Sequence, residues 1–384
     1  MRPDLLVYGD TLRSPALRHE VPLAIGDPFL FLETGGLRAV VTNVLEDDRV
    51  AAAAPDLQRL QVTELGFDEL IAEGRTRQEV ELEVAARAVA RLGIRAAAVP
   101  PEFPVALADR LRAGGVELRP DAALFEERRR RKTAAELAGI RRAADAGMAA
   151  MREAARLLRE ARPDGDVLRD AAGDVLTSEG VRARLAAVCA AHGAQLPADV
   201  IVAPMGPGDP VGHDAGSGRL PPHTPLCVDL WPQDEASGCW ADMTRTFVVG
   251  DVADAVAELH TLVLEAHERS LAALRPGVPG VEAYGAACDV FEAAGHPTQR
   301  TKRAGERLAH GFFFSLGHGV GLEVHEAPAL GRTGHDPLVA GDVVAVEPGV
   351  VVPATGGMRV EDLVVVGEDG NENLTAALPY ALAP

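Results

Sequence analysis

The stretch at residues 314–326, Phe-Ser-Leu-Gly-His-Gly-Val-Gly-Leu-Glu-Val-His-Glu, constrains this chain more than any other. It places His318 and His325 seven positions apart, with three glycines around the first histidine. Because side chains on a strand alternate between two faces, this odd separation would point the imidazoles of a regular strand in opposite directions. Glycines instead suit a bent backbone that passes close to another part of the chain. We therefore predict a loop or short strand that delivers both imidazoles to one cavity; two core histidines beside a turn are the alternative.

Composition bounds the class of protein. A length of 384 residues favours two domains over one core. The formal net charge of −19 argues against nucleic acid or an anionic membrane surface as the main partner. No apolar run reaches the ~18 residues that a membrane span needs, and the amino terminus shows no hydrophobic signal region. The four cysteines form no Cys-x-x-Cys pair, so we expect free buried thiols in a reducing cytoplasm.

Residues 1–125 are predicted to form a smaller α/β domain. Short apolar runs typical of buried strands alternate with a helical apolar stripe at residues 77–92. Strands that alternate with helices indicate an open, mostly parallel sheet. The strands are predicted at residues 5–8, 28–32, 37–42 and 96–100.

Residues 126–384 are predicted to form the second domain, beginning with a charged run at residues 126–132 that is typical of a solvated linker or helix end. Thr133 and Glu136 form a capping box that opens a long helix. Further helices are predicted at residues 181–192, 253–274 and 284–294, and strands at 199–203, 225–230, 243–249, 343–347, 349–352 and, last, 358–366. This repeated order, in which helices are followed by strands twice over, suggests an α+β fold built by internal duplication, with helices on one side of a mostly antiparallel sheet.

Four carboxylates stand in apolar strand sequence of this second region. They are Asp229 at the end of one predicted strand, Asp242 before the next, Glu347 where a strand meets a turn, and Glu361 within residues 358–366. A buried carboxylate is costly unless it is paired or binds a metal, although each acid taken singly could be an exposed turn residue. Together with His318, four oxygen ligands and one imidazole suit two hard or borderline divalent ions that share bridging carboxylates. Such a pair of ions activates water and polarises a carbonyl.

Five motifs that contain these residues follow one another in order: Asp229, Asp-Met-Thr-Arg-Thr at 242–246, Gly-His-Gly-Val-Gly at 317–321, Glu-Pro-Gly at 347–349 and Arg-Val-Glu at 359–361. Over roughly residues 133–384 the chain thereby resembles the methionine aminopeptidase and Xaa-Pro peptidase superfamily, the pita-bread metallopeptidases. The resemblance implies a C-terminal pita-bread fold made of duplicated helix and antiparallel-sheet halves. The N-terminal region is similar in size and position to that of prolidases, aminopeptidases P and creatinases. The implied ligands of two divalent ions are Asp229, Asp242, His318, Glu347 and Glu361, with Asp242 and Glu361 as the bridging residues.

The resemblance also implies roles in catalysis and substrate binding. His325 matches the family histidine that contacts the substrate and the tetrahedral intermediate, and His213 matches the upstream histidine of the Xaa-Pro branch. Glu347 is implied as general acid and base in that branch. Arg359 is similar to an arginine of Xaa-Pro enzymes and would bind a substrate carboxylate or carbonyl with its planar donors; a structural salt bridge is the alternative. Histidines without partners in the sequence, His267 among them, are expected at the surface or at helix ends.

The expected function is hydrolysis of the bond between an N-terminal residue and proline in short peptides, as in a prolidase or an aminopeptidase P. Manganese is the first choice of metal, with cobalt or zinc as alternatives, and the resemblance implies a homodimer. Two other functions stay open: an amidohydrolase that acts on a non-peptide amide, and a catalytically silent pita-bread module that binds peptides. Twelve residues separate Asp229 from Asp242, where these enzymes more often have ten, so the longer turn at residues 231–238 leaves the substrate open.

Overall fold

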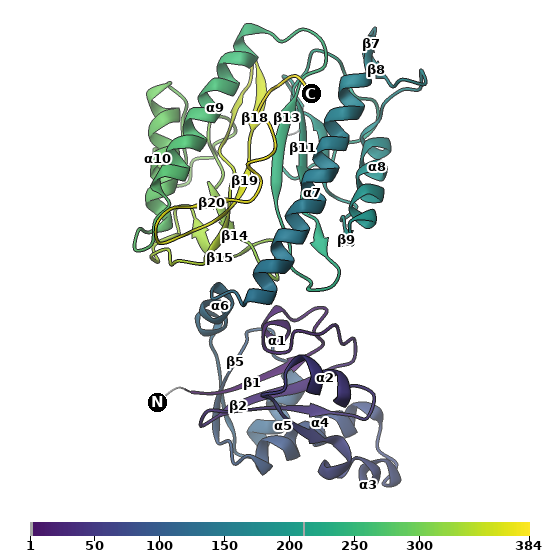
Figure 1. The fold of residues 1–384 in the computed structure, drawn as a ribbon. Helices are drawn as coiled ribbons and strands as arrows, with labels where there is room; N and C mark the ends of the chain where they lie inside the picture. Colours follow the sequence, from purple (N-terminus) through teal and green to yellow (C-terminus); the bar gives the residue numbers. More distant parts are fainter. Residues whose placement is uncertain (1–2, 210–211) are drawn as a thin grey trace. The chain divides into compact units, whose positions relative to one another are not determined.

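The computed structural model describes residues 3–209 and 212–384, and its internal contacts divide the chain into two units, Met1–Arg129 and Arg130–Pro384 (Figure 1). Each unit encloses its own clusters of buried apolar side chains. That residues 1–125 and 126–384 are separate domains stays a prediction. Among the described residues, no helix is both long and apolar enough to cross a bilayer.

A six-stranded sheet forms the centre of the first unit, in the order β4-β3-β2-β1-β5-β6. Its strands are β1 (Asp4–Gly9), β2 (Phe29–Thr34), β3 (Leu37–Thr42), β4 (Gln58–Gln61), β5 (Ala96–Val99) and β6 (Glu117–Pro120). Its helices are α1 (Pro15–Glu20), α2 (Asp47–Ala53), α3 (Phe67–Ala72), α4 (Arg77–Arg91), α5 (Val105–Ala113) and α6 (Ala122–Arg130), with a 3₁₀ turn at Val62–Leu65.

The pairings in this sheet are mixed. Three are parallel, as the sequence predicts. However, β2 pairs antiparallel with both β1 and β3, and no helix separates β2 from β3, so the expected alternation of strands with helices is wrong between those two strands. The reason lies in Gly35 and Gly36, whose positive φ angles of 56° and 88° close a two-residue hairpin between β2 and β3. Helix α4 begins at a capping box formed by Thr76 and Glu79 and buries the predicted apolar stripe.

The second unit contains helices α7 (Ala134–Glu160), α8 (Ser178–Ala191), α9 (Asp254–Ala273) and α10 (Gly280–Ala293). Its longer strands are β10 (Ile201–Pro204), β11 (Leu226–Leu230), β13 (Met243–Phe247), β15 (Glu326–Leu330), β16 (Val343–Val346), β17 (Gly349–Val352), β18 (Gly356–Arg359) and β19 (Asp362–Val365). The shorter ones are β7 (Arg162–Asp164), β8 (Val167–Arg169), β9 (Ala194–Gln195), β12 (Gln233–Asp234), β14 (Gly317–Gly319) and β20 (Glu372–Asn373).

These elements form two similar halves, each with a pair of helices beside antiparallel strands. In the first half, α7 and α8 accompany the sheet β10-β11-β13. In the second half, α9 and α10 accompany the sheet β15-β14-β16-β19-β20. Figure 1 shows the helix pairs flanking the strands from opposite sides. The α+β class with duplicated halves is thus confirmed, and the strands between the helix pairs carry the candidate site.

Two local predictions are wrong. Residues 358–366 form not one final strand but two, because β18 pairs with β17 while β19 pairs with β16 and β20. Glu361 therefore lies in the connection where the chain passes from one sheet to another. The charged run at residues 126–132 contains the end of helix α6, at Arg130, as predicted, but it is not wholly solvated. Arg130 is buried, since its Nε and Nη2 atoms lie 3.0 and 2.6 Å from the carboxylate oxygens of buried Asp342.

Candidate active site

The glycine-rich histidine stretch bends as the sequence predicts. The pairing of β14 with β15 shifts register between His318 and Gly319. A Cβ atom at Gly317 would lie 1.9 Å from the carbonyl oxygen of Ala345, and one at Gly319 would lie 2.2 Å from that of Ala327. Only glycine allows such close backbone approach. The bend brings the rings of His318 and His325 together, with centroids 4.1 Å apart.

A cavity of about 300 Å³ collects the residues that the sequence singles out. Its lining includes all five predicted metal ligands and the three other predicted site residues: Asp229, Asp242, His318, Glu347, Glu361, His213, His325 and Arg359. Asp242, His318 and Glu361 each present one ligand atom within 4.8 Å of the others. His318 Nε2 also lies 3.7 Å from Glu347 Oε1. Pro210 and Val211, which shortly precede His213 in the chain, lie outside the described residues.

Strand geometry explains why these acids converge. Asp229 on β11 lies opposite Thr244 on β13, two positions beyond Asp242, which immediately precedes β13. Thr244 joins this pair of strands to Glu361, since its carbonyl accepts from the Glu361 amide at 3.1 Å and its hydroxyl donates to Glu361 Oε2 at 2.7 Å. Glu347 follows β16, and its amide donates to the carbonyl of Leu316 at 2.7 Å. Acids from both halves of the unit thus meet in one place.

The electrostatics are those of carboxylates that need a cation. Burial, followed by the charges of Glu361 and Asp229, raises the pKa of Asp242 well above its ordinary value. Burial and then Asp229 likewise raise the pKa of Glu361, and burial raises the pKa of Glu347 to about 7. Burial and then His325 lower the pKa of His318 to about 4, which keeps its imidazole neutral. A divalent cation among these groups would restore the charged carboxylates and take the neutral imidazole as a ligand.

Unsatisfied atoms support the same conclusion. The Oδ1 atoms of Asp229 and Asp242 are buried and have no hydrogen-bond partner among the described residues. Buried polar atoms are normally paired, so each such atom requires an explanation. Oxygen atoms of this kind, with an imidazole beside them, are the donors that divalent ions such as manganese prefer. The residues present therefore fit a metal site.

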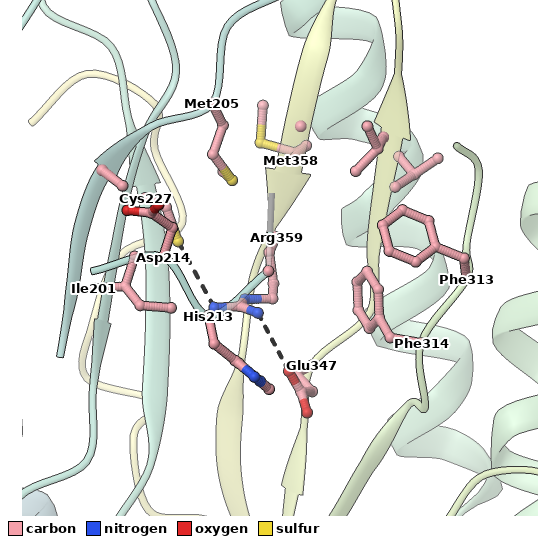
Figure 2. A pocket seen from close by; sticks show the side chains of 15 residues that line it. Ile201, Met205, His213, Asp214, Cys227, Phe313, Phe314, Glu347, Met358 and Arg359 are labelled. Carbon is pink, nitrogen blue, oxygen red and sulfur yellow. Dashed lines mark hydrogen bonds and ion pairs between the residues drawn. The ribbon is translucent and has the colours of Figure 1, made fainter. Parts of the chain in front are cut away.

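Arg359 lies among these acids. It forms a close ion pair with Asp229, and its Nη1 atom lies 3.6 Å from Glu347 Oε2. A weaker contact of 3.9 Å joins its Nη2 atom to the thiol of Cys227 (Figure 2). The salt bridge weighed as the alternative for this arginine is thus present. However, its buried Nε atom has no partner in the described part of the chain, which leaves one donor available.

An apolar cavity of about 250 Å³ adjoins the acidic one. Figure 2 shows Met205 and Met358 on one side of Arg359, Phe313 and Phe314 on another, and His213 and Glu347 below it. His213, Glu347 and Arg359 line both cavities, so the two spaces meet at these residues. Most of the other lining atoms come from aliphatic, aromatic and sulfur-containing side chains.

The longer turn between Asp229 and Asp242 is an ordered part of the site wall. Trp231 lines the acidic cavity. Beyond it, β12 pairs with β9, and Asp234 accepts two hydrogen bonds from Arg142, at 2.9 and 2.8 Å. Cys239 packs in the core of the unit rather than lining the cavity.

Sequence reasoning missed a second group of residues behind Glu361. Arg245 and Asp362 are buried and form an ion pair of 2.8 Å. His267, expected at the surface or at a helix end, is instead buried within α9, 3.4 Å from Asp362. The available signal was Asp362 itself, an acid next to Glu361 in the same apolar stretch.

The chain has relatives among known proteins. Residues 138–368 match the sequence profile of metallopeptidase family M24. An uncharacterized peptidase of Bacillus subtilis is 38% identical over 138 residues, which is 36% of this chain and 36% of that protein. The Xaa-Pro dipeptidase of Pyrococcus furiosus is 37% identical over 135 residues, 35% of each protein. The matched segment therefore spans only about a third of the length of these relatives.

Solved structures resemble nearly the whole chain. An Xaa-Pro dipeptidase from Bacillus anthracis has a TM-score of 0.77 at 25% identity and covers 99% of this chain and 94% of its own. An X-Pro aminopeptidase from Thermotoga maritima has a TM-score of 0.75 at 24% identity, over 98% of this chain and 96% of its own, and supports the fold. The family profile covers more than half of the chain and includes all five predicted ligand residues. This chain therefore belongs to metallopeptidase family M24.

Proposed function

We propose that the protein is a dinuclear metal-dependent peptidase that hydrolyses the bond between an N-terminal residue and proline in short peptides. The observation that carries the proposal is the convergence of the four predicted ligand carboxylates and three imidazoles in one cavity, next to an apolar one. Membership of family M24 supports a metallopeptidase. The names of the relatives, an Xaa-Pro dipeptidase and an X-Pro aminopeptidase, support the substrate class.

Two divalent ions would be held by Asp229, Asp242, His318, Glu347 and Glu361. Manganese is our first choice, and cobalt or zinc are the alternatives, because the set is dominated by oxygen ligands with one borderline imidazole. Bound there, such ions lower the pKa of water and polarise the peptide carbonyl.

The remaining residues would bind substrate and move protons. Glu347, which lines both cavities, would accept the proton of water and return it to the leaving amine. His325 and His213 would contact the carbonyl oxygen and the leaving side of the scissile bond; burial and then His213 lower the pKa of His325, so its imidazole is neutral. The free Nε atom of Arg359 could donate to a substrate carboxylate or carbonyl. The apolar cavity beside these groups would take a side chain of the peptide.

The compartment and the assembly are part of the proposal. Four buried free thiols fit a reducing cytoplasm, and the resemblance to Xaa-Pro peptidases favours a homodimer. Short peptides are the proposed partners, and a net charge of −19 disfavours nucleic acid and anionic membranes. Sedimentation equilibrium would test the dimer directly.

The deciding experiment is release of the N-terminal amino acid from Ala-Pro and from Ala-Pro-Ala. The protein would be stripped with chelator and reloaded with manganese, with Asp242→Asn as the matched control that keeps the size of the side chain. Cleavage of the dipeptide alone indicates a prolidase, and cleavage of the longer peptide an aminopeptidase P. Metal binding without cleavage of either would instead favour an amidohydrolase of non-peptide amides or a silent peptide-binding module.

A further inference from the structure

Two consecutive residues of β13 contact Glu361, which precedes β19, and Asp362, which begins it. Thr244 contacts Glu361, and Arg245 contacts Asp362. Because successive side chains on a strand point to opposite faces, the two contacts lie on opposite sides of this junction. The first involves the Glu361 carboxylate, which lines the acidic cavity. The second lies in the interior, where Arg245 is 2% exposed and Asp362 is 0% exposed.

Arg245 holds the main chain of the ligand residue as well as the side chain of its neighbour. Its Nη1 atom donates to the carbonyl oxygen of Glu361 at 2.7 Å and to that of Thr244 at 2.9 Å. Its Nη2 atom donates to Asp362 Oδ1 at 2.8 Å. The guanidinium thereby ties both strands together at the residue that carries the Glu361 carboxylate.

Asp362 is in turn fixed by a segment that follows it in the chain. Asn373 Nδ2 and Thr375 Oγ1 donate to its carboxylate at 2.6 and 2.8 Å, and the hydroxyl of Tyr380 donates to the same carboxylate at still closer range. The guanidinium carbon of Arg245 also lies over the ring of Tyr380, 4.6 Å from the ring centroid. Both oxygens of this carboxylate are therefore engaged by several donors, and residues 373–380 close the network.

A buried network of this kind costs desolvation, and its net contribution to stability is small. Its effect on geometry is larger, since hydrogen-bonded partners behind a metal ligand orient that ligand and tune its affinity. Glu361 is held from two directions, by the hydroxyl of Thr244 at its carboxylate and by Arg245 at its carbonyl.

We propose that Thr244, Arg245 and Asp362, locked by Tyr380, form the device that positions the Glu361 carboxylate and so sets the affinity of this unit for divalent metal. These are positioning residues, which act through Glu361. The inference rests on the proposed assignment of Glu361 as a metal ligand and does not depend on which peptide, if any, is cleaved.

The test uses the chelator-stripped full-length chain and cobalt(II), whose visible absorption bands report ligand geometry. Thr244→Val removes the hydroxyl, Thr244→Ser keeps it, and Tyr380→Phe removes one donor to Asp362 outside the cavity. Calorimetric titration should show cobalt affinity about 10- to 100-fold weaker for Thr244→Val, a weakening in the same direction for Tyr380→Phe, and altered visible bands for both. Thr244→Ser should restore affinity and bands.

The matched control is Tyr284→Phe, which removes another buried tyrosine hydroxyl, from a ring that packs 5.4 Å from Phe312. Its cobalt affinity should equal that of the unmodified protein. If Thr244→Val and Tyr380→Phe lower the melting temperature but leave cobalt affinity and bands unchanged, the network is only structural and the inference is overturned. Absence of cobalt binding by the unmodified protein would overturn it together with the metal site. Tight binding of cobalt without peptide cleavage would contradict the proposed peptidase function, and the same titrations would still test this inference.

Discussion

His318 and His325 face each other at 4.1 Å between ring centroids, although seven positions and a register shift separate them along the chain. Their surroundings differ. His318 lies within 3.7 to 3.8 Å of the carboxylates of Glu347 and Asp242, whereas His325 is exposed and lies on the side of His213. The two imidazoles should therefore respond differently to removal.

We expect His325→Ala to bind both metal ions and to lose about 10²- to 10³-fold in kcat, the usual cost of removing one donor to a developing oxyanion. His318→Ala should instead lose metal. Elemental analysis of the dialysed proteins, together with steady-state kinetics on Ala-Pro, distinguishes the two effects. Loss of metal from His325→Ala would contradict the division of roles.

Metal removal should destabilise the folded protein. Without a cation, four carboxylates share one buried cavity and burial raises the pKa of Asp242 and Glu361. Manganese at 100 times its dissociation constant should add about 2.7 kcal/mol to the free energy of unfolding. Thermal melts with chelator and with manganese measure this. The double variant Asp242→Asn/Glu361→Gln removes two of the proposed ligand carboxylates, so it should not bind manganese and its melting temperature should not rise with the metal; a rise equal to that of the unmodified protein would place the ions elsewhere.

A buried ion pair supports the loop that carries His325. Lys132 and Glu326 form a close contact, with side chains that are 3% and 2% exposed, and Glu326 directly follows His325. Lys132→Met should lower the free energy of unfolding by about 3–5 kcal/mol, because it leaves a buried carboxylate uncompensated. Urea titration measures the loss.

Two further variants test whether burial of the Lys132–Glu326 pair causes this loss of stability. Lys132→Met/Glu326→Met removes both charges and should recover much of the lost stability. Arg141→Met breaks the exposed pair with Glu372, whose side chains are 45% and 54% exposed, and should cost no more than about 1 kcal/mol. Equal losses from Lys132→Met and Arg141→Met would show that burial of the Lys132 pair has no special effect.

Sequence reasoning succeeded where a local pattern determines the structure. The capping box at Thr133 and Glu136 is formed, and the glycines around His318 mark real backbone contacts. The four predicted ligand acids and His318 line one cavity, as the sequence predicts; Asp229 and His318 lie within β11 and β14, and the other three lie next to a strand end.

It failed where distant partners determine the outcome. In sequence, residues 358–366 resemble one apolar strand. Their alternation of apolar and polar side chains gives no sign that the chain passes from one sheet to another at Glu361. That passage is held by Thr244 and Arg245, which lie 117 and 116 positions away along the chain. His267, on helix α9, likewise has no local signal of burial, since its partner Asp362 comes from strand β19.

The four cysteines offer a final prediction that involves no metal. Burial raises the pKa of Cys189, Cys239 and Cys227 to about 12, and it raises that of Cys288 as well. Since the thiolate is the reactive form, Ellman's reagent at pH 8 should find no reactive thiol in the folded protein and four after denaturation.

The raised pKa values of the buried thiols also predict how stability falls at alkaline pH. An unfolded thiol ionises near its ordinary pKa of 9, whereas the folded one stays protonated, so this contribution to stability is complete below pH 9 and is lost between pH 9 and about 12. Cys227→Ala should flatten that part of the stability profile measured by urea titration, and an unchanged slope would show that other groups cause the alkaline loss.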